Sequence, residues 1–208
     1  LQIEEALLRT TEDDWCLINE GSSPSIVMGI SGKAEKLIDL KKIESHPIPI
    51  IKRFSGGGTV VVDDDTLFVS YIFQKDTHEF PCYPEPILRW SEKLYQEALD
   101  IPSFHLREND YVIGKRKCGG NAQYIKKQRF VHHTTFLWDF KEKHMDYLLH
   151  PEKTPSYRAS RSHTDFLCKL KDFLPTKKHF ISSIIETLSK HYDLSNASLE
   201  SLTPVLDT

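Results

Sequence analysis

Residues 52–61 of this 208-residue sequence read KRFSGGGTVV, in which a cation and three consecutive glycines precede a run of β-branched residues. Successive glycines let the backbone approach a ligand closely and point several N–H groups at its anionic oxygens. The guanidinium of Arg53 can form two parallel hydrogen bonds with a phosphate or a carboxylate. The stretch therefore indicates a nucleotide cradle, and a flexible hairpin turn is the alternative that the spacing leaves open.

The glycine loop differs from the two common phosphate-binding motifs. No Gly-Lys-Ser/Thr follows the glycines, as a Walker loop requires. The residues after the glycines predict a strand, whereas a helix follows the glycines of the dinucleotide-binding fingerprint. A nucleotide held here would therefore sit at the start of a strand.

On both sides of the loop, hydrophobic spacing predicts hairpins mixed with helices. Before the loop we expect an amphipathic helix at 3–9, a hairpin of strands 15–18 and 26–30, and a surface helix at 34–43. After the loop we expect strands at 59–62 and 67–73, a helix at 87–99, strands at 104–106, 111–113 and 130–140, and a mostly helical third from residue 144 on. Because strands and helices do not alternate strictly, this order predicts an α+β fold with a mixed, largely antiparallel sheet flanked by helices.

Composition and charge are typical of one folded catalytic domain over residues 1–208. Hydrophobic residues make up 39% of the chain and charged residues 27%. The formal net charge of -3 argues against a surface built to neutralise nucleic-acid phosphates. No apolar run reaches the roughly 20 residues that cross a bilayer. Neither a nucleic acid nor a membrane is therefore expected as a partner.

Cysteine usage points to a reducing compartment. The four cysteines, at positions 16, 82, 118 and 168, are spread too widely for a zinc site or a disulfide scaffold. The first residue is Leu1 and not methionine, so a targeting peptide could have been removed. We therefore expect a cytoplasmic protein, or one of the mitochondrial or plastid matrix if such a peptide existed, and not a secreted one.

A second motif places a lysine among glycines. Residues 107–123 read RENDYVIGKRKCGGNAQ. A lysine on a glycine-flanked hairpin can reach both a carboxylate and an α-phosphate and can stabilise charge while the phosphate is attacked. Lys117 is therefore the catalytic candidate, whereas Lys115 and Arg116 point elsewhere if strand alternation continues through the turn. A solvated basic turn is the alternative interpretation.

A third motif is a predicted strand that begins with paired histidines. Residues 130–139 read FVHHTTFLWD. Neighbouring residues on a strand face opposite sides, so at most one of His132 and His133 can face a site. A metal-binding histidine pair is therefore not expected.

Taken together, the three motifs resemble those of the lipoate–protein ligase A family and its biotin/lipoate ligase relatives. The matching segments are 52–60, 109–122 and 132–135, in this order and at these separations. The opening Glu4-Glu5 and the later Ser160-Arg161-Ser162 also fit the family's pattern. The resemblance runs from Leu1 to about Leu170, and three motifs in one order are more specific than any single one.

The resemblance implies a fold like the catalytic domain of biotin protein ligases and class II aminoacyl-tRNA synthetases. It also implies a reaction in two steps. ATP with Mg²⁺ would convert lipoate to lipoyl-AMP, and a lysine of a lipoyl-domain protein would then accept the acyl group. The implied acceptors are the E2 subunits of 2-oxoacid dehydrogenases and the H protein of glycine cleavage.

The resemblance further implies roles for individual residues. Lys117 would contact both the lipoate carboxylate and the adenylate phosphate. ATP or the adenylate would be bound by Arg53, Ser55, Gly56, Gly57, Gly58, Thr59, Val60, Val61, Asn109, Asp110 and Lys117. Lipoate would be bound by Lys117, Gly120, Ala122 and His133, and we expect Phe54, Val60 and Val61 to help line a slot for its chain.

Several positions depart from the family's pattern. Val62 stands where many members have a histidine before the aspartate, Lys52 replaces the first arginine, and Gly119 replaces a serine. These substitutions preserve charge and small size, but they leave open whether the acid is lipoate, octanoate or another. Too little chain follows residue 170 for the C-terminal accessory domain that many bacterial ligases carry, so we expect either that a partner protein is needed for the activation step or that the protein performs transfer only.

Three alternatives compete with individual parts of this interpretation. Cys118 beside Lys117 suggests an ATP-independent octanoyl or lipoyl transferase that uses a thioester, because a nearby cation lowers a thiol pKa. Asp63, Asp64 and Asp65 have the ligands that Mg²⁺ prefers, although an acidic turn explains them more simply. The six Lys or Arg residues within 115–129 suggest a non-enzymatic RNA-binding module, which the overall negative charge disfavours.

Overall fold

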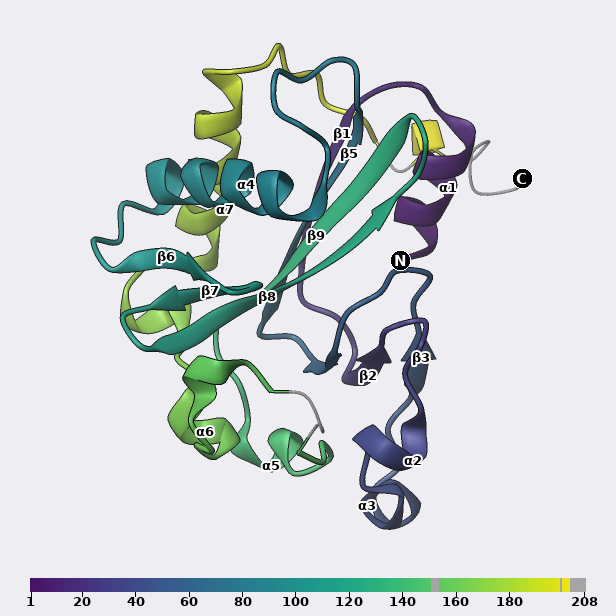
Figure 1. Cartoon of the computed structure of the whole chain (residues 1–208), viewed down its shortest axis with the longest axis vertical. Helices are drawn as coiled ribbons and strands as arrows, with labels where there is room; N and C mark the ends of the chain where they lie inside the picture. The colour runs from purple at the N-terminus through teal and green to yellow at the C-terminus, as the bar shows by residue number, and fades with distance from the viewer. Residues whose placement is uncertain (151–153, 199, 203–208) are drawn as a thin grey trace.

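The computed structural model describes residues 1–150, 154–198 and 200–202, and their strands form two sheets (Figure 1). A six-stranded sheet has the order β1-β5-β9-β8-β7-β6, and a three-stranded sheet has the order β3-β2-β4. The strands are β1 (Trp15–Glu20), β2 (Ser25–Met28), β3 (Ile50–Lys52), β4 (Thr59–Val62), β5 (Thr66–Gln74), β6 (Phe104–Arg107), β7 (Asp110–Ile113), β8 (Arg116–Ile125) and β9 (Arg129–Leu137).

The described helices differ widely in length. They are α1 (Gln2–Thr10), α2 (Ala34–Leu37), α3 (Leu40–Ser45), α4 (Pro84–Leu99), α5 (Glu142–Met145), α6 (His163–Phe166) and α7 (Lys177–Ser189). Short 3-10 helices lie at Ser156–Arg158, Leu170–Asp172 and Glu200–Leu202. Among the described helices, none is both long and apolar enough to cross a membrane.

The large sheet is antiparallel at every pairing and carries the main core. Helices α4 and α7 pack against each other beside it (Figure 1). Tyr95 of α4 and Phe180 of α7 each meet the ring of Phe136 on β9 edge to face, with ring centroids 4.9 and 5.2 Å apart. All three rings are fully buried, so this aromatic contact fixes the helices on the sheet.

The small sheet positions the glycine loop. Strand β2 runs parallel to β3 and antiparallel to β4. Parallel neighbours need a crossover connection, and α2 and α3 lie within the one between β2 and β3. The glycine loop, residues 53–58, then joins β3 to β4 across the end of β2.

The predicted fold class is confirmed, since a mixed but largely antiparallel arrangement of strands is flanked by helices. The opening helix is α1, and the helix predicted at 87–99 is α4. Helix α4 begins earlier than predicted, at Pro84, because a proline is well accommodated in the first turn of a helix. The C-terminal third is helical only in part, with α7 as its one long helix among the described residues.

The predicted hairpin of strands 15–18 and 26–30 is wrong. Strand β1 pairs with β5, whereas β2 pairs with β3 and β4 in the other sheet. Between them Gly21, with a φ of +76°, donates its N–H to the carbonyl of Thr66 and turns the chain out of the large sheet. The chain does turn between the two strands, but this turn connects the two sheets and does not join β1 to β2 as a hairpin.

Two further elements differ from the prediction. The helix expected at 34–43 is two short helices, because Ile38 forms a β-bridge with Leu148 between them. The glycine-rich segment expected to be a hairpin is strand β8, paired on both edges. Gly119 fits this strand because the ring of Phe136 packs on it, and a Cβ at position 119 would lie 2.8 Å from that ring.

Candidate functional site

A cavity of about 2040 Å³ lies where both sheets meet the segment between β9 and α7. Its lining includes β4 and part of the glycine loop, β8 and β9 of the large sheet, and residues of α5 and α6. A single drug-sized ligand occupies a pocket of roughly 300–1,000 Å³. The cavity therefore has room for more than one small ligand.

Arg53 folds back on the glycine loop that follows it. Its Nε and Nη2 donate to the carbonyl of Gly56 at 3.1 and 2.8 Å, and Nη2 also donates to the carbonyl of Gly58 at 2.9 Å. The side chain is buried, and burial lowers the pKa of Arg53 while the carboxylate of Glu4 opposes that effect. Two of the three guanidinium nitrogens of Arg53 therefore bind the loop and fix its shape.

Gly57 occupies a backbone conformation that favours glycine. Its φ is +104°, and a Cβ there would lie 2.6 Å from Nη2 of Arg53. Gly29 is equally constrained, because a Cβ at position 29 would lie 2.2 Å from the carbonyl oxygen of Gly57. Gly56 differs from both, since a Cβ at position 56 would meet nothing within 4 Å.

The loop turns its carbonyls toward a cation and leaves its amides available. Within the part of the chain that the structure describes, the N–H groups of Gly56, Gly57 and Gly58 donate to no protein acceptor. Gly57 and Gly58 line the cavity. Neighbouring unpaired amides in a tight loop form a concavity that suits an anion.

Lys117 reaches the same cavity from strand β8. Its Nζ forms an ion pair of 2.7 Å with Oδ1 of Asp110, and its side chain is 22% exposed. The lysine lies over Gly120, where a Cβ would be 3.0 Å from Nζ. Gly120 therefore makes room for the ammonium.

Strand β8 brings the glycine loop and the lysine together. Gly120 and Ala122 are two residues apart and thus face the same side of the strand. The ammonium of Lys117 lies over Gly120, and a Cβ on Gly57 would lie 3.4 Å from the Cβ of Ala122. Two strand residues span roughly 7 Å. The cation and the unpaired amides are therefore neighbours in one cavity.

A serine–histidine–glutamate chain supports the loop from behind. Oγ of Ser55 lies 2.9 Å from Nε2 of His133, whose Nδ1 lies 3.4 Å from Oε1 of Glu4. The hydroxyl of Ser70 also donates to Glu4. Burial alone would raise the pKa of Glu4, but its interactions with His133 outweigh this and lower it to about 2. The loop is thus tied to a carboxylate on α1.

The paired histidines separate as the strand alternation requires. His133 lines the cavity, whereas His132 is fully buried, with Nε2 3.0 Å from Oγ of Ser91 and Nδ1 3.2 Å from Nε2 of Gln123. Burial and the neighbouring His133 lower the pKa of His132 to about 3. His132 is therefore a neutral core residue.

Cys118 faces away from the cavity. Its side chain is fully buried in the main core, and its thiol donates to the carbonyl of Tyr111 at 3.4 Å. Burial, reinforced by Cys168, raises the pKa of Cys118 well above its usual range. A nucleophilic thiol needs exposure and a lowered pKa, and Cys118 has neither.

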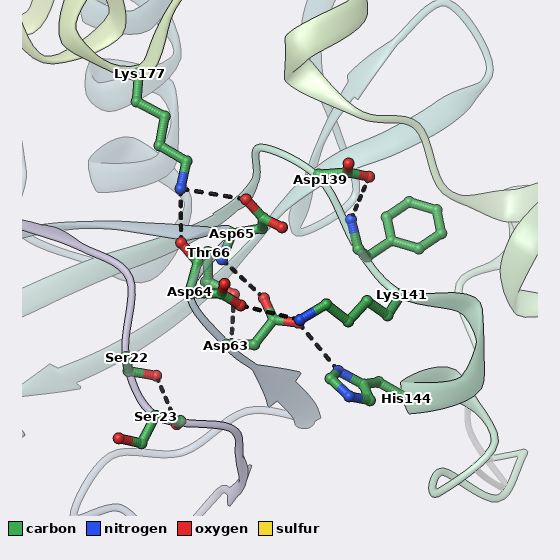
Figure 2. Close-up of polar contacts among 11 residues, drawn as sticks. Ser22, Ser23, Asp63, Asp64, Asp65, Thr66, Asp139, Lys141, His144 and Lys177 are labelled. Carbon is green, nitrogen blue, oxygen red and sulfur yellow. Dashed lines mark hydrogen bonds and ion pairs between the residues drawn. The ribbon is translucent and has the colours of Figure 1, made fainter.

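The three aspartates after β4 form an ion-pair network (Figure 2). Their carboxylates lie close enough together to hold a metal ion. Each is nevertheless paired already, Asp63 with His144 at 3.0 Å, Asp64 with Lys141 at 3.3 Å and Asp65 with Lys177 at 3.3 Å. These contacts join the β4–β5 turn to α5 and α7, so the cluster does not fit a resident Mg²⁺.

Apolar side chains form another part of the cavity wall. They include Leu37, Val60, Met145, Leu148, Phe166 and Leu167. Phe54, expected in this wall, is absent from it and packs instead against Tyr124 with ring centroids 5.5 Å apart. It lies on the other side of the loop because neighbouring positions in an extended chain face opposite ways.

The cavity gathers most of the residues that the sequence nominated. Its lining contains Arg53, Gly57, Gly58, Thr59, Val60, Val61, Asn109, Asp110, Lys117, Gly120, Ala122 and His133, but neither Ser55, Gly56 nor Cys118. Sequence reasoning missed Glu4 and Arg158, which also line it. A signal for Glu4 existed, because a carboxylate three and four residues before Leu7 and Leu8 lies on the apolar face of the helix.

Residues 1–193 match the model of the lipoyl protein ligase A/B catalytic domain family. An inactive lipoate–protein ligase 2 of Plasmodium falciparum is 34% identical over 215 residues, covering 85% of this chain and 54% of the relative. A lipoate-protein ligase of Bacillus subtilis is 28% identical over 189 residues, covering 88% and 56%. The chain thus spans about half the length of these curated relatives.

Solved lipoate ligases share the fold. A bipartite lipoate protein ligase of Thermoplasma acidophilum, described with its E2 lipoyl domain, gives a TM-score of 0.82 at 19% identity over 99% of this chain and 84% of that chain. A lipoate-protein ligase A bound with ATP gives 0.79 at 18% identity, over 99% and 86%. A T. acidophilum ligase with bound lipoic acid gives 0.79 at 17% identity, over 99% and 86%.

Proposed function

Because the chain belongs to the lipoyl protein ligase A/B catalytic domain family, we propose that it activates lipoate with ATP and transfers the lipoyl group to a lysine of an acceptor protein. The observation that carries this proposal is the meeting of the Lys117 ammonium and the unpaired glycine amides in one cavity. An acyl-adenylate has its charged phosphate beside an apolar chain. The cavity offers cationic and amide groups beside an apolar wall.

In the first step a carboxylate oxygen of lipoate attacks the α-phosphorus of ATP. A new oxygen–phosphorus bond forms, the bond to the β-phosphate oxygen breaks, and pyrophosphate leaves. Negative charge concentrates on the α-phosphate oxygens during this step, where preorganised donors stabilise it most. Lys117 and the amides of Gly57 and Gly58 are the donors that we assign to these oxygens.

Asp110 prepares Lys117 for this role. The carboxylate of Asp110 holds the ammonium at 2.7 Å on one side and accepts a hydrogen bond of 2.9 Å from the hydroxyl of Tyr157 on the other. The lysine side chain is therefore oriented before a ligand arrives, which lowers the entropy lost on binding.

In the second step the amine of an acceptor lysine attacks the acyl carbonyl of the adenylate. An amide bond forms, and AMP leaves because an adenylate is a far better leaving group than a free carboxylate oxygen. Lipoyl-domain proteins, such as E2 subunits and the glycine-cleavage H protein, are the acceptors we propose, and the T. acidophilum relative with its E2 lipoyl domain supports this class.

The ATP-bound and lipoic-acid-bound relatives support the choice of substrates. The acidic cluster gives a resident Mg²⁺ little support, because Asp64 and Asp65 are paired with lysines and Asp63 is hydrogen-bonded to His144. In this proposal Mg²⁺ enters with the nucleotide.

Exchange of radiolabelled pyrophosphate into ATP tests the activation step directly. We expect exchange only when an acid is present, and a panel of lipoate, octanoate and biotin would define the acid. Absence of exchange with every acid, together with acyl transfer from an octanoylated carrier protein, would replace the ligase by a transferase. Salt-sensitive RNA binding without either activity would point to a binding module instead.

A further inference from the structure

A second cationic feature of the cavity is the arginine turn, residues 156–161, which includes the 3-10 helix Ser156–Arg158. Three side-chain contacts dock this turn on the large sheet. Ser156 Oγ donates to Glu108 at 2.5 Å, and Tyr157 donates to Asp110 at 2.9 Å. Nη1 of Arg161 donates to the carbonyl of Lys115 at 3.0 Å. The turn therefore sits beside the carboxylate that holds Lys117.

Two residues of the arginine turn have a left-handed backbone conformation. Ala159 and Ser160 have φ values of +50° and +59°, a region that residues other than glycine seldom occupy. Arg161 closes the turn, since its guanidinium donates to the carbonyls of Tyr157 and Arg158 at 2.8 and 3.0 Å. Strained turns of this kind persist where the surrounding structure holds them, often at ligand sites.

Arg158 is the residue that this turn presents to the cavity. The side chain is only 5% exposed, and it lines the cavity together with Lys117 and His163. Its Nε donates to the carbonyl of Arg161 at 3.1 Å, and its guanidinium lies 5.1 Å from the centroid of the Phe166 ring. These two contacts hold the guanidinium in place.

The charge of Arg158 has no counter-ion. Among the described residues, no carboxylate pairs with it, and its buried Nη2 has no hydrogen-bond partner. Burial and the neighbouring Arg161 lower its pKa. Burying a guanidinium without an anion or full hydrogen bonding costs free energy, so Arg158 is suited to bind an anionic group.

The surrounding charges leave that anion to the ligand. Asp110 is committed to Lys117 and to Tyr157. His163 does not add a positive charge, because burial and the neighbouring Arg158, His150 and Lys117 lower its pKa to about 4.

From this arrangement we infer that Arg158 binds phosphate oxygens of the nucleotide polyphosphate, in the cavity that Lys117 also lines, in the reaction proposed above. A guanidinium fork matches two oxygens of one phosphate group, and a polyphosphate carries enough charge to need a cation beyond the paired lysine. A single acyl carboxylate does not, since Lys117 and the glycine amides already suffice for it. The inference rests on the proposed function for the identity of the ligand only.

Binding of inorganic pyrophosphate by calorimetry tests this assignment. We expect Arg158→Gln to weaken pyrophosphate binding roughly 10-fold or more, because one charge-assisted bidentate contact is lost. Arg158→Lys should recover part of the affinity. The matched control is Arg107→Gln, which removes an exposed guanidinium that lies 4.7 Å from the centroid of the Tyr157 ring. The Arg107→Gln protein should bind pyrophosphate with the affinity of the wild type.

Thermal stability supplies a second readout that a merely structural arginine would not give. The Arg158→Gln protein should melt no lower than the wild type without ligand, because an unpaired buried charge is removed. Pyrophosphate should raise the melting temperature of the wild type and raise that of the variant much less. A variant that melts lower and keeps its pyrophosphate affinity would overturn the inference.

Binding of octanoate separates phosphate recognition from carboxylate recognition. Arg158→Gln should leave octanoate affinity within about 3-fold of the wild type. Weaker octanoate binding with unchanged pyrophosphate binding would assign Arg158 to the acid and contradict the proposal. The two proposals can fail separately. If the wild type bound pyrophosphate but catalysed no pyrophosphate–ATP exchange, and Arg158→Gln abolished that binding, the proposed function would be wrong and the phosphate site at Arg158 would be supported.

Discussion

Two arginines line the same cavity from different parts of the chain, and they differ in how many hydrogen bonds their guanidinium groups already make. Arg53 donates three hydrogen bonds to carbonyls of its own loop, with Glu4 as the nearby negative charge. Arg158 donates one hydrogen bond to its own turn and keeps a buried Nη2 without a partner. The guanidinium of Arg53 therefore shapes the glycine loop, whereas that of Arg158 has a donor available for a ligand.

The comparison shows why a cation in a motif does not by itself identify a ligand contact. Arg53 stands in the most informative motif of the sequence, yet its hydrogen bonds serve the loop. The amides of the loop donate to no acceptor among the described residues, whereas Nε and Nη2 of Arg53 already donate to loop carbonyls. Hydrogen-bond accounting in three dimensions decides the role of each group.

The largest effect should come from removing the cation that faces the loop. Lys117→Ala is expected to lower the rate of pyrophosphate–ATP exchange about 10²–10³-fold, as when one preorganised oxyanion donor is lost. Lys115→Ala is the matched control, because Lys115 is exposed in the turn before β8. Equal rates for the two variants would contradict the role assigned to Lys117.

Removing the carboxylate of Glu4 should lower the free energy of unfolding by an amount that depends on pH. The folded pKa of Glu4, about 2, lies below the usual value of 4.5, so its contribution is present above pH 4.5 and is lost as the pH falls toward 2. Glu4→Gln should therefore lower the free energy of unfolding at pH 7 by ~3 kcal/mol or less. Chemical denaturation from pH 7 to pH 3 measures whether this difference shrinks.

Glu5→Gln is the control for that measurement. Glu5 lies on the same helix but pairs with Arg9 at the surface, so its substitution should leave the unfolding curves nearly unchanged at every pH. A difference between wild type and Glu4→Gln that stayed constant with pH would show that the hydrogen-bonded carboxylate is not its source.

Neighbouring glycines offer a sharper comparison within the loop. Gly57→Ala should lower the free energy of unfolding by about 1–3 kcal/mol, because a positive φ is imposed on a residue with a Cβ that meets Arg53. Gly56→Ala should cost less than about 1 kcal/mol, since its Cβ meets open space. Thermal or urea unfolding of both variants measures the contrast, and equal losses would mean that Arg53 does not constrain the turn.

The acidic turn should give the smallest effect. Asp64→Asn removes one exposed partner of Lys141, and surface pairs contribute little. We expect no measurable change in pyrophosphate–ATP exchange, and no rise in melting temperature when Mg²⁺ is added to the wild type without nucleotide. A Mg²⁺-dependent rise that disappears in Asp64→Asn would make the turn a metal site after all.

Local motifs predicted the central contacts of the cavity better than they predicted the fold around them. The motifs nominated Lys117 and the glycine loop one by one, whereas their meeting in one cavity depends on the packing of β8 beside the loop and was implied only by the family resemblance. Glycine is depleted in strands, so the sequence predicts a turn at Gly119 and Gly120, although pairing on both edges makes them part of β8.

The remaining features depend on contacts between distant residues. Strand β1 finds its partner some fifty residues later, in β5, which no hairpin pattern reveals. Glu4 reaches His133 across 129 positions of sequence. The face of Cys118 and the unpaired state of Arg158 likewise follow from packing, because burial and hydrogen-bond partners are properties of the folded chain.

A crystal structure with a lipoyl-sulfamoyl adenosine, which mimics the adenylate without being cleaved, tests the central claim most directly. We predict that Nζ of Lys117 and an amide of Gly57 or Gly58 lie within hydrogen-bonding distance of the sulfamoyl group, with the lipoyl chain along the apolar wall. A sulfamoyl group that contacts neither the lysine nor the glycine amides would contradict the account.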